Sequence, residues 1–137
     1  MRTPLPPPAA VLSFIDAVNH GDVERLAALM HEDYRLEVLD EPSVDGKVAN
    51  VEGWHGYVDS FTEYVIAPHE IVAHGDTVVV LGHTTGSHLD LPDEDESRLT
   101  VIWRATVRDG RLTLWQILED TSARRWELGF RSGLADF

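Results

Sequence analysis

Two N-terminal segments carry apolar residues at helical spacing. The first predicts a helix over residues 9–20, whose apolar face is formed by Val11, Phe14, Ile15 and Val18. Gly21 follows this helix, as is typical of a helix end, and Asp22 can cap the next one. The second helix has its apolar face at Val23, Leu26, Leu29 and Met30. We therefore expect a helical hairpin at the start of the chain.

The period of the apolar pattern changes after this hairpin. Residues 34–40 alternate apolar and polar side chains, which predicts a strand buried on one face. Proline and glycine then mark a loop over residues 41–53. Helical spacing resumes with Trp54, so a third helix is expected over residues 54–65, ended by Pro68.

Strand-like runs fill the rest of the chain, at residues 69–74, 77–89, 98–108 and 111–120. Asp109 and Gly110 form the strongest turn signal, because both tolerate the positive φ angles of a type I′ turn. Short turns of this kind join antiparallel strands. The expected fold is therefore α+β, with a strongly curved antiparallel sheet wrapped around about three N-terminal helices, and with helices 9–20 and 54–66 on its concave side.

Length and composition limit the possible architectures. The chain has 137 residues, of which 43% are hydrophobic, and this supports one folded core. We expect a single domain over residues 9–137 after a mobile, proline-rich tail at residues 1–8. No segment is as long and apolar as a membrane span, and the start lacks the features of a signal peptide. The sequence therefore predicts a cytoplasmic protein.

Charge and motifs narrow the chemistry further. The chain has 24 acidic and 11 basic residues, a net charge of −13, and no cysteine. This charge repels phosphate backbones and anionic membranes, so neither nucleic acid nor membrane is expected as a partner. Glycine-rich phosphate loops, nucleophile turns and paired zinc histidines are missing from the sequence. We expect no cofactor and no metal.

Several segments, in this order and spacing, resemble the nuclear-transport-factor-2-like superfamily. They are Phe14–Leu26, Gly53–Tyr57 at the start of the third helix, and Val107–Leu112 followed by Trp115–Asp120. The resemblance covers residues 9–130 and is closest to the SnoaL-like polyketide-cyclase branch and its limonene-epoxide-hydrolase-like and ketosteroid-isomerase-like relatives. It implies a cone-shaped barrel with an apolar pocket between sheet and helices, often in a dimer. It also implies a small apolar ligand, similar to a polyketide or terpenoid.

Asp120 is the first catalytic candidate. SnoaL-like and epoxide-hydrolase-like relatives resemble one another in carrying a pocket aspartate at the end of the last strand, where Asp120 lies. Apolar walls from Trp103, Leu114 and Leu118 would disfavour its charged form and raise its pKa into the range of an acid–base catalyst. The alternative is that Asp120 caps a short helix that follows. A bulge in the last strand would turn Asp120 out to solvent.

Asp40 and His83 are the other catalytic candidates. Asp40 continues the buried face of the first strand to the rim of the expected pocket. Isomerase-like relatives carry a base near this point, although the position that aligns with it is Val38; the alternative is a solvated turn carboxylate. His83 alternates with Val79 and Leu81 on the face expected to be concave, where it could share a proton with Asp120.

The other histidines of this region give no metal site. His88 is five positions after His83 and so lies on the opposite face of a regular strand. His69 lies near a catalytic histidine of dehydratase-like relatives, but Val18 and Asn19 stand where those relatives carry tyrosine and aspartate. For His69 and His83 the alternative is a structural histidine bonded to backbone or water.

Aromatic residues supply most of the ligand-binding candidates. Phe14 stands where isomerase-like relatives place an oxyanion-hole tyrosine, and Trp103 where they place a protonated aspartate. A phenyl ring cannot donate a hydrogen bond, which disfavours steroid-type isomerisation, although an indole N–H could donate. The candidates are Phe14, Trp54, Tyr57, Phe61, Trp103 and Gln116. For the aromatic ones the alternative is packing in the core.

The resulting hypothesis is a cofactor-independent enzyme of cyclase, isomerase or epoxide-hydrolase type that uses carboxylate acid–base catalysis on a mostly apolar substrate. The alternative is a non-catalytic ligand-binding or dimerisation module of the same fold. The module is favoured if Asp40, His83 and Asp120 fail to line one cavity, and the enzyme if a carboxylate with a raised pKa lies there. A homodimer is expected because Ile102 and Ile117 would leave the outer face of the sheet apolar.

Overall fold

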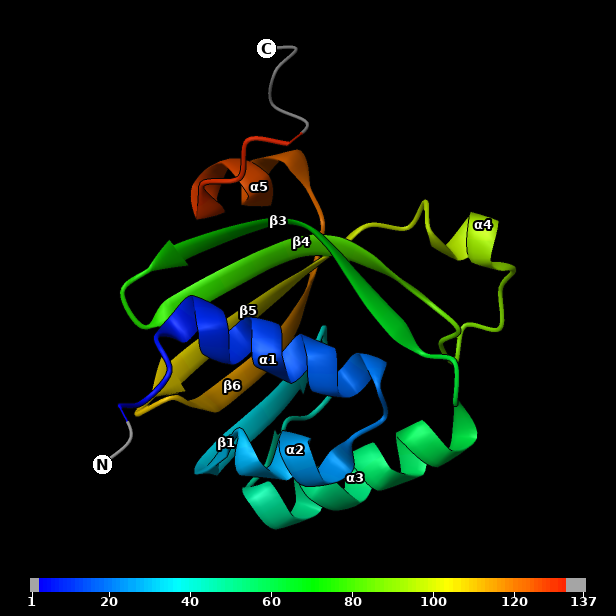
Figure 1. Ribbon diagram of the computed structural model, residues 1–137. Helices are drawn as coiled ribbons and strands as arrows, with labels where there is room; N and C mark the ends of the chain where they lie inside the picture. The colour runs from blue at the N-terminus through cyan, green and yellow to red at the C-terminus, as the bar shows by residue number, and fades with distance from the viewer. Residues whose placement is uncertain (1–2, 133–137) are drawn as a thin grey trace.

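The computed structural model describes residues 3–132 (Figure 1). Its elements in chain order are α1 (Pro7–Asn19), α2 (Val23–Ala28), β1 (Met30–Val38), β2 (Val44–Asp45), α3 (Lys47–Ser60), β3 (Val65–His74), β4 (Thr77–Thr85), α4 (Asp93–Glu96), β5 (Val101–Arg108), β6 (Arg111–Glu119) and α5 (Ser122–Leu128). Within the described residues, no helix is long and apolar enough to cross a membrane.

A single curved sheet organises the fold, with strand order β2-β1-β6-β5-β4-β3. The β3–β4, β4–β5 and β5–β6 pairs are antiparallel, as expected for the long strands, whereas β1 and β6 run parallel. Asp109 and Gly110 have φ angles of 54° and 77°, which confirms the tight turn between β5 and β6. The α+β prediction is therefore confirmed, with one parallel pair added.

The helices lie on both sides of this sheet (Figure 1). α1, α2 and α3 lie on the concave side and close the inner core, whose largest side chains are Phe14, Tyr34, Trp103 and Trp115. α5 lies on the convex side, where Phe130 and Leu128 pack on Val79, Leu81 and Ile102. The chain itself thus covers Ile102, so the apolar surface that suggested a homodimer is smaller than expected. Dimerisation remains a prediction.

Several predicted boundaries are wrong: the strand expected from Tyr34 begins at Met30, and the helix expected to reach residue 65 ends at Ser60. Two further changes, at the starts of α3 and β3, involve segments without a simple apolar period. α3 begins at Lys47 rather than at Trp54; its first turn exposes Val48 and buries Asn50, whose amide donates to the carbonyl oxygens of Val44 and Gly46 at 3.0 and 2.8 Å. β3 begins at Val65 and runs through Pro68. Proline is tolerated there because β3 is an edge strand and its register shifts between Pro68 and Glu70.

A bulge in β6 decides which side chains face the inner core. Thr106 pairs with Leu114 and Val107 with Leu112, which leaves Thr113 as an extra residue. Leu112 and Trp115 therefore both lie in the inner core, although they are three residues apart. Beyond the bulge Ile117 packs on the inner core and Leu118 on the outer one. The expectation that Ile117 lies on the outer face is wrong.

Candidate functional site

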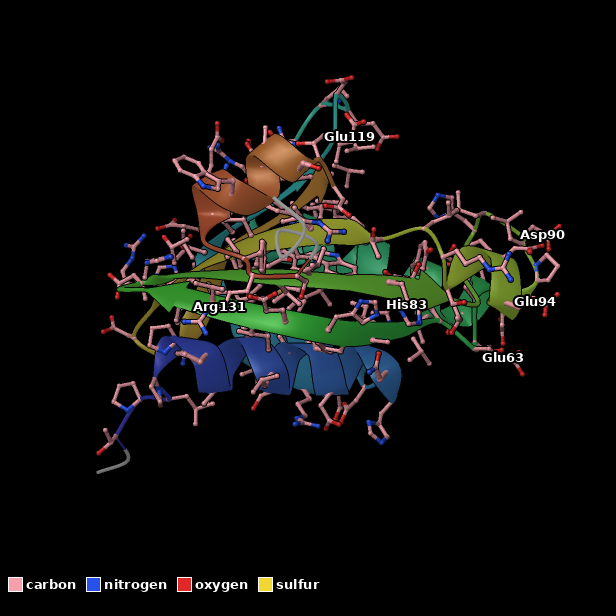
Figure 2. The ribbon with its side chains drawn as sticks, turned by 90° about the horizontal axis from the view of Figure 1, so that it is seen from above. Glu63, His83, Asp90, Glu94, Glu119 and Arg131 are labelled. Carbon is pink, nitrogen blue, oxygen red and sulfur yellow. The ribbon has the colours of Figure 1, made fainter. Side chains whose placement is uncertain are left out.

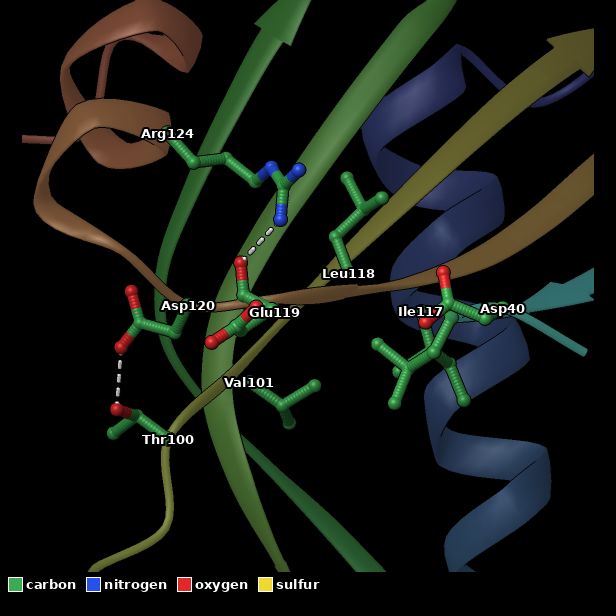
Figure 3. Close-up of a pocket in the computed structure, with 9 residues that line it drawn as sticks. Asp40, Thr100, Val101, Ile117, Leu118, Glu119, Asp120 and Arg124 are labelled. Carbon is green, nitrogen blue, oxygen red and sulfur yellow. Dashed lines mark hydrogen bonds between the residues drawn. The ribbon is translucent and has the colours of Figure 1, made fainter.

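An open cleft of about 440 Å³ lies at the rim of the cone, where β1 and β6 end and β5 begins (Figure 3). We call it the rim cleft. It is lined by Leu39, Asp40, Thr100, Val101, Ile117, Leu118, Glu119, Asp120 and Arg124. Val101 and Ile117 also pack against the inner core, so the apolar floor of the cleft is continuous with the interior of the cone.

Asp40 lies in this cleft with an exposed side chain. It follows Leu39, whose positive φ angle of 46° ends β1 and turns the chain. Asp40 and Asp120 thus line the same cleft, as expected for a carboxylate pair, and His83 is not among its lining residues.

Asp120 has an environment opposite to the predicted one. The β6 bulge turns it away from the inner core, and its side chain, 8% exposed, is gripped by Arg125 of α5. Arg125 Nε and Nη2 donate to the two carboxylate oxygens at 2.6 and 2.5 Å, and Thr100 Oγ1 donates to Oδ2 at 2.5 Å. The hydrogen bond from Arg125 holds the pKa of Asp120 below its ordinary value. The predicted raised pKa is therefore wrong.

The alternative role of Asp120, as the cap of the helix that follows, is also wrong. Thr121 caps α5, because its hydroxyl accepts from the backbone N–H of Arg124 at 3.1 Å. Asp120 instead joins the end of β6 to the middle of α5 through Arg125. Its position next to the cleft and its ion pair both indicate that it anchors α5 to the sheet.

Glu70 of β3 forms a second anchor for the C-terminal segment. Its carboxylate accepts from the backbone N–H groups of Arg131 and Ser132, both at 2.8 Å, and from Ser132 Oγ at 2.5 Å. Burial acts to raise the pKa of Glu70, but these hydrogen bonds outweigh it and the pKa is lowered. The convex side therefore carries two carboxylates that dock α5 and the residues after it.

We expect this docking to weaken in acid. Both pKa values are lowered by folding, so the stabilisation is fully present above the ordinary values, 3.8 for Asp120 and 4.5 for Glu70, and is lost as the pH falls below them. Amide hydrogen exchange of residues 122–132 should report the loss below about pH 4.5. In Glu70→Gln the part of the transition due to Glu70 should disappear; an unchanged acid transition would contradict the assignment.

His83 lies on the convex face rather than the concave one. It alternates with Val79 and Leu81 as predicted, but those two residues pack in the outer core beneath Phe130. His83 Nδ1 shares a hydrogen bond of 2.6 Å with Nε2 of His69 on β3. Residues 3–132 contain no group of three or more histidine, aspartate or glutamate side chains placed to hold a metal ion.

The predicted ligand-binding residues divide between the two faces. Gln116 is on the convex side, where its Oε1 accepts from Arg104 Nε at 2.8 Å, so its assignment to a concave pocket is wrong. Phe14 and Trp103 are buried in the inner core. The rings of Trp54, Tyr57 and Phe61 are half-buried along α3 and its end and contact one another in sequence.

Two buried donors of the inner core have no hydrogen-bond partner among residues 3–132: Tyr34 Oη and Trp103 Nε1. Tyr34 is 0% and Trp103 1% exposed. Burial raises the pKa of Tyr34 more than the nearby side chain of Trp54 lowers it, so its phenol stays protonated and able to donate. An indole N–H can only donate, so the O–H of Tyr34 still lacks an acceptor. Sequence reasoning placed Tyr34 on the buried face of a strand but did not assign it a function, since an aromatic residue in an alternating strand is typical of a core.

Glu96 is a second residue that the sequence did not single out. It belongs to the acidic run of α4, whose other members are exposed, yet it is itself only 1% exposed. Its carboxylate accepts hydrogen bonds from Thr84 Oγ1 and from the backbone N–H of Ser87, the latter at 3.3 Å. A run of four acidic residues is typical of a solvated loop, so no local signal marks the buried one.

Comparison with known proteins agrees with the fold. The model of the SnoaL-like domain matches residues 11–115. No curated protein shows significant sequence similarity to the chain. A candidate polyketide cyclase from Sinorhizobium meliloti is 26% identical, with a TM-score of 0.67, and the match covers 81% of this chain and 94% of that one.

Two further solved structures share the fold at lower identity. TerC, co-crystallised with polyporic acid, is 23% identical with a TM-score of 0.67, and the match covers 90% of this chain and 98% of that one. An epoxide hydrolase from M. tuberculosis, of the limonene-epoxide-hydrolase-like type, is 20% identical with a TM-score of 0.65, covering 82% and 80%. With the cone-shaped fold and the match over residues 11–115, the chain belongs to the SnoaL-like family of the nuclear-transport-factor-2-like superfamily.

Proposed function

We propose that this chain is a cofactor-independent enzyme of cyclase, isomerase or epoxide-hydrolase type that acts on a mostly apolar small molecule bearing an oxygen acceptor. The observation that carries the proposal is the pair of buried, unpartnered donors, Tyr34 Oη and Trp103 Nε1. A buried donor without a partner costs free energy, so a native structure that keeps two of them needs a reason, and a ligand oxygen that accepts from both supplies one.

The two donors lie on the same face of the sheet as the floor of the rim cleft. Val101 and Ile117 form the apolar floor of the cleft, and Trp103 is paired directly with Ile117 and lies two residues from Val101 on the same face. Tyr34 lies deeper, on β1, with its ring 6.1 Å from that of Phe14. A ligand that displaces the half-buried side chains of Val101 and Ile117 meets Trp103 first and Tyr34 next.

Asp40 is the residue that we propose as the general base. Its carboxylate is exposed within the rim cleft, and no ion pair engages it among the described residues, in contrast to Asp120. A free carboxylate beside an apolar floor can take a proton from a bound substrate, while the two neutral donors stabilise the negative charge that develops on the substrate oxygen. The fold of TerC, co-crystallised with polyporic acid, supports small-molecule binding as the general function.

Replacing Tyr34 by phenylalanine tests the donors without a known substrate. The change removes a buried hydroxyl whose O–H has no acceptor, so we expect the free energy of unfolding to rise by about 1 kcal/mol, measured by denaturant titration. Tyr57→Phe is the control: its hydroxyl bonds to His88 Nδ1 at 2.8 Å, and its loss should lower the same quantity by about 1 kcal/mol. A Tyr34→Phe protein less stable than the wild type would remove the basis of the proposal.

A ligand panel separates the enzyme from the non-catalytic module, which the ion-paired state of Asp120 keeps as the second candidate. The panel contains polyporic acid, apolar epoxides and enones, and binding is followed by tryptophan fluorescence. On the enzyme hypothesis Asp40→Asn lowers turnover by about 10²–10⁴-fold while binding is retained. Binding that weakens in Tyr34→Phe, without turnover of any member by the wild type, would favour the module.

A further inference from the structure

The loop over residues 86–100 spans the rim of the cone from the end of β4 to the start of β5 and contains α4 (Figure 1). It reaches the rim cleft at its far end, where Thr100 and Val101 are lining residues. Asp90 and Glu94 point outward from the loop, away from the sheet (Figure 2). The loop is thus strongly acidic on its outer side and stands beside the entrance of the proposed pocket.

Glu96 fastens this loop to the inner face of the sheet. Thr84, which donates to Glu96 Oε2, follows Gly82 by two residues on β4, and Gly82 pairs with Val101 of the rim cleft. The second carboxylate oxygen accepts from Ser87 within the loop. No arginine, lysine or histidine nitrogen of the described residues lies within 4.0 Å of Glu96. Two neutral donors therefore hold a buried carboxylate, an arrangement that one opening movement can release to water.

His88 fastens the same loop to α3. Its Nδ1 shares a hydrogen bond of 2.8 Å with Tyr57 Oη, and its backbone N–H donates to the same oxygen at 3.2 Å. The loop therefore bridges α3 and β4. The His88–Tyr57 contact involves polar groups near the surface, which break more readily than an apolar core.

The two contacts close the rim over a line of aromatic rings that leads inward. Tyr64 packs at 4.9 Å from Tyr57, Trp54 at 6.3 Å from Tyr57, and Phe14 at 6.0 Å from Trp54. Burial raises the pKa of Tyr64, and its neighbours Tyr57 and Glu96 act in the same direction. These rings connect the contact of the loop on α3 with Phe14 of the inner core.

We propose that loop 86–100 is a lid, latched to β4 by Glu96 and to α3 by His88, which opens as a unit to admit a ligand to the aromatic side of the cone. The identity of the ligand that the lid admits rests on the proposed function, whereas the movement of the loop does not. Release of Glu96 exposes its carboxylate to water, where a charged group is stable, so opening does not strand an uncompensated charge.

Amide hydrogen exchange of the full chain tests the latch. In Glu96→Gln and Glu96→Ala we expect amides of residues 86–100 to exchange about tenfold faster than in the wild type, with β5 and β6 unchanged. Glu94→Gln, in the exposed part of the same acidic run, is the matched control and should leave the loop as in the wild type. Equal loop exchange in all three variants, or acceleration throughout the sheet, would overturn the lid.

Binding kinetics give a readout that separates the lid from the proposed function. With polyporic acid as the probe and stopped-flow tryptophan fluorescence, the Glu96→Gln variant should show association and dissociation rates raised together several-fold, with little change in Kd. An association rate equal to that of the wild type would count against the lid. Failure of the wild type to bind would contradict the proposed ligand while leaving the exchange result valid.

Discussion

Asp120→Ala should lower the free energy of unfolding by about 2–3 kcal/mol, because it strands the Arg125 guanidinium against the end of the sheet. Loss of one partner from a fully buried ion pair costs about 3–5 kcal/mol, and the 19% exposure of Arg125 reduces this figure. Arg125 would keep Ser132 O as an acceptor, at 3.0 Å, but would lose both carboxylate oxygens. Denaturant titration at neutral pH measures the difference.

Arg124→Ala provides the control for this substitution. Arg124 is the neighbour of Arg125 on α5, and it donates to the backbone oxygen of Glu119 at 2.7 Å near the surface. Its loss should cost less than about 1 kcal/mol. A loss in Asp120→Ala no larger than that in Arg124→Ala would show that Asp120 does not anchor α5, and would return the residue to the catalytic candidates.

Gly86→Ala is expected to be at least as damaging, with a loss of about 3 kcal/mol. Gly86 begins the lid with a φ angle of +69°, and a Cβ there would lie 2.3 Å from the backbone oxygen of Glu63. The positive φ alone costs about 1–2 kcal/mol for a residue with a side chain, and the contact with backbone adds to it because backbone cannot move aside cheaply. Thermal and denaturant unfolding both measure this loss.

Gly75→Ala separates the two contributions. Gly75 has a φ angle of +60° in the β3–β4 turn, and a Cβ at this position meets nothing within 4 Å. It should therefore lose only the conformational part, about 1 kcal/mol. If Gly86→Ala proved no worse than Gly75→Ala, the close packing of the lid on Glu63 would be wrong.

Local sequence determined the elements whose signal does not depend on tertiary contacts. The α1–α2 hairpin, the Asp109–Gly110 turn and the antiparallel pairing of the long strands were predictable because spacing, caps and positive-φ residues act within a few positions. The family followed from the order of these elements together with a few local motifs.

The faces of the strands were decided only by the tertiary structure. Val78, Val79, Val80 and Leu81 form a continuous apolar run because β4 is covered on both sides. Alternation therefore could not show that His83 lies on the convex side rather than inside the cone. In β6 the single extra residue Thr113 exchanged the two faces and moved Asp120 to the convex side. A bulge of one residue cannot be predicted from the composition or from the apolar period of a strand.

The positions of the site residues also depend partly on local sequence and partly on contacts between distant segments. Asp40 was predictable at the rim because a strand that ends at a turn places its next residue there. Glu96 was not predictable, since its burial depends on Thr84 and Ser87, which approach it only when the loop folds back on β4. The sequence by itself thus determined the family, the α1–α2 hairpin and the long antiparallel strands. The packed structure decided which carboxylates are free, paired or buried, because that depends on partners distant in the chain.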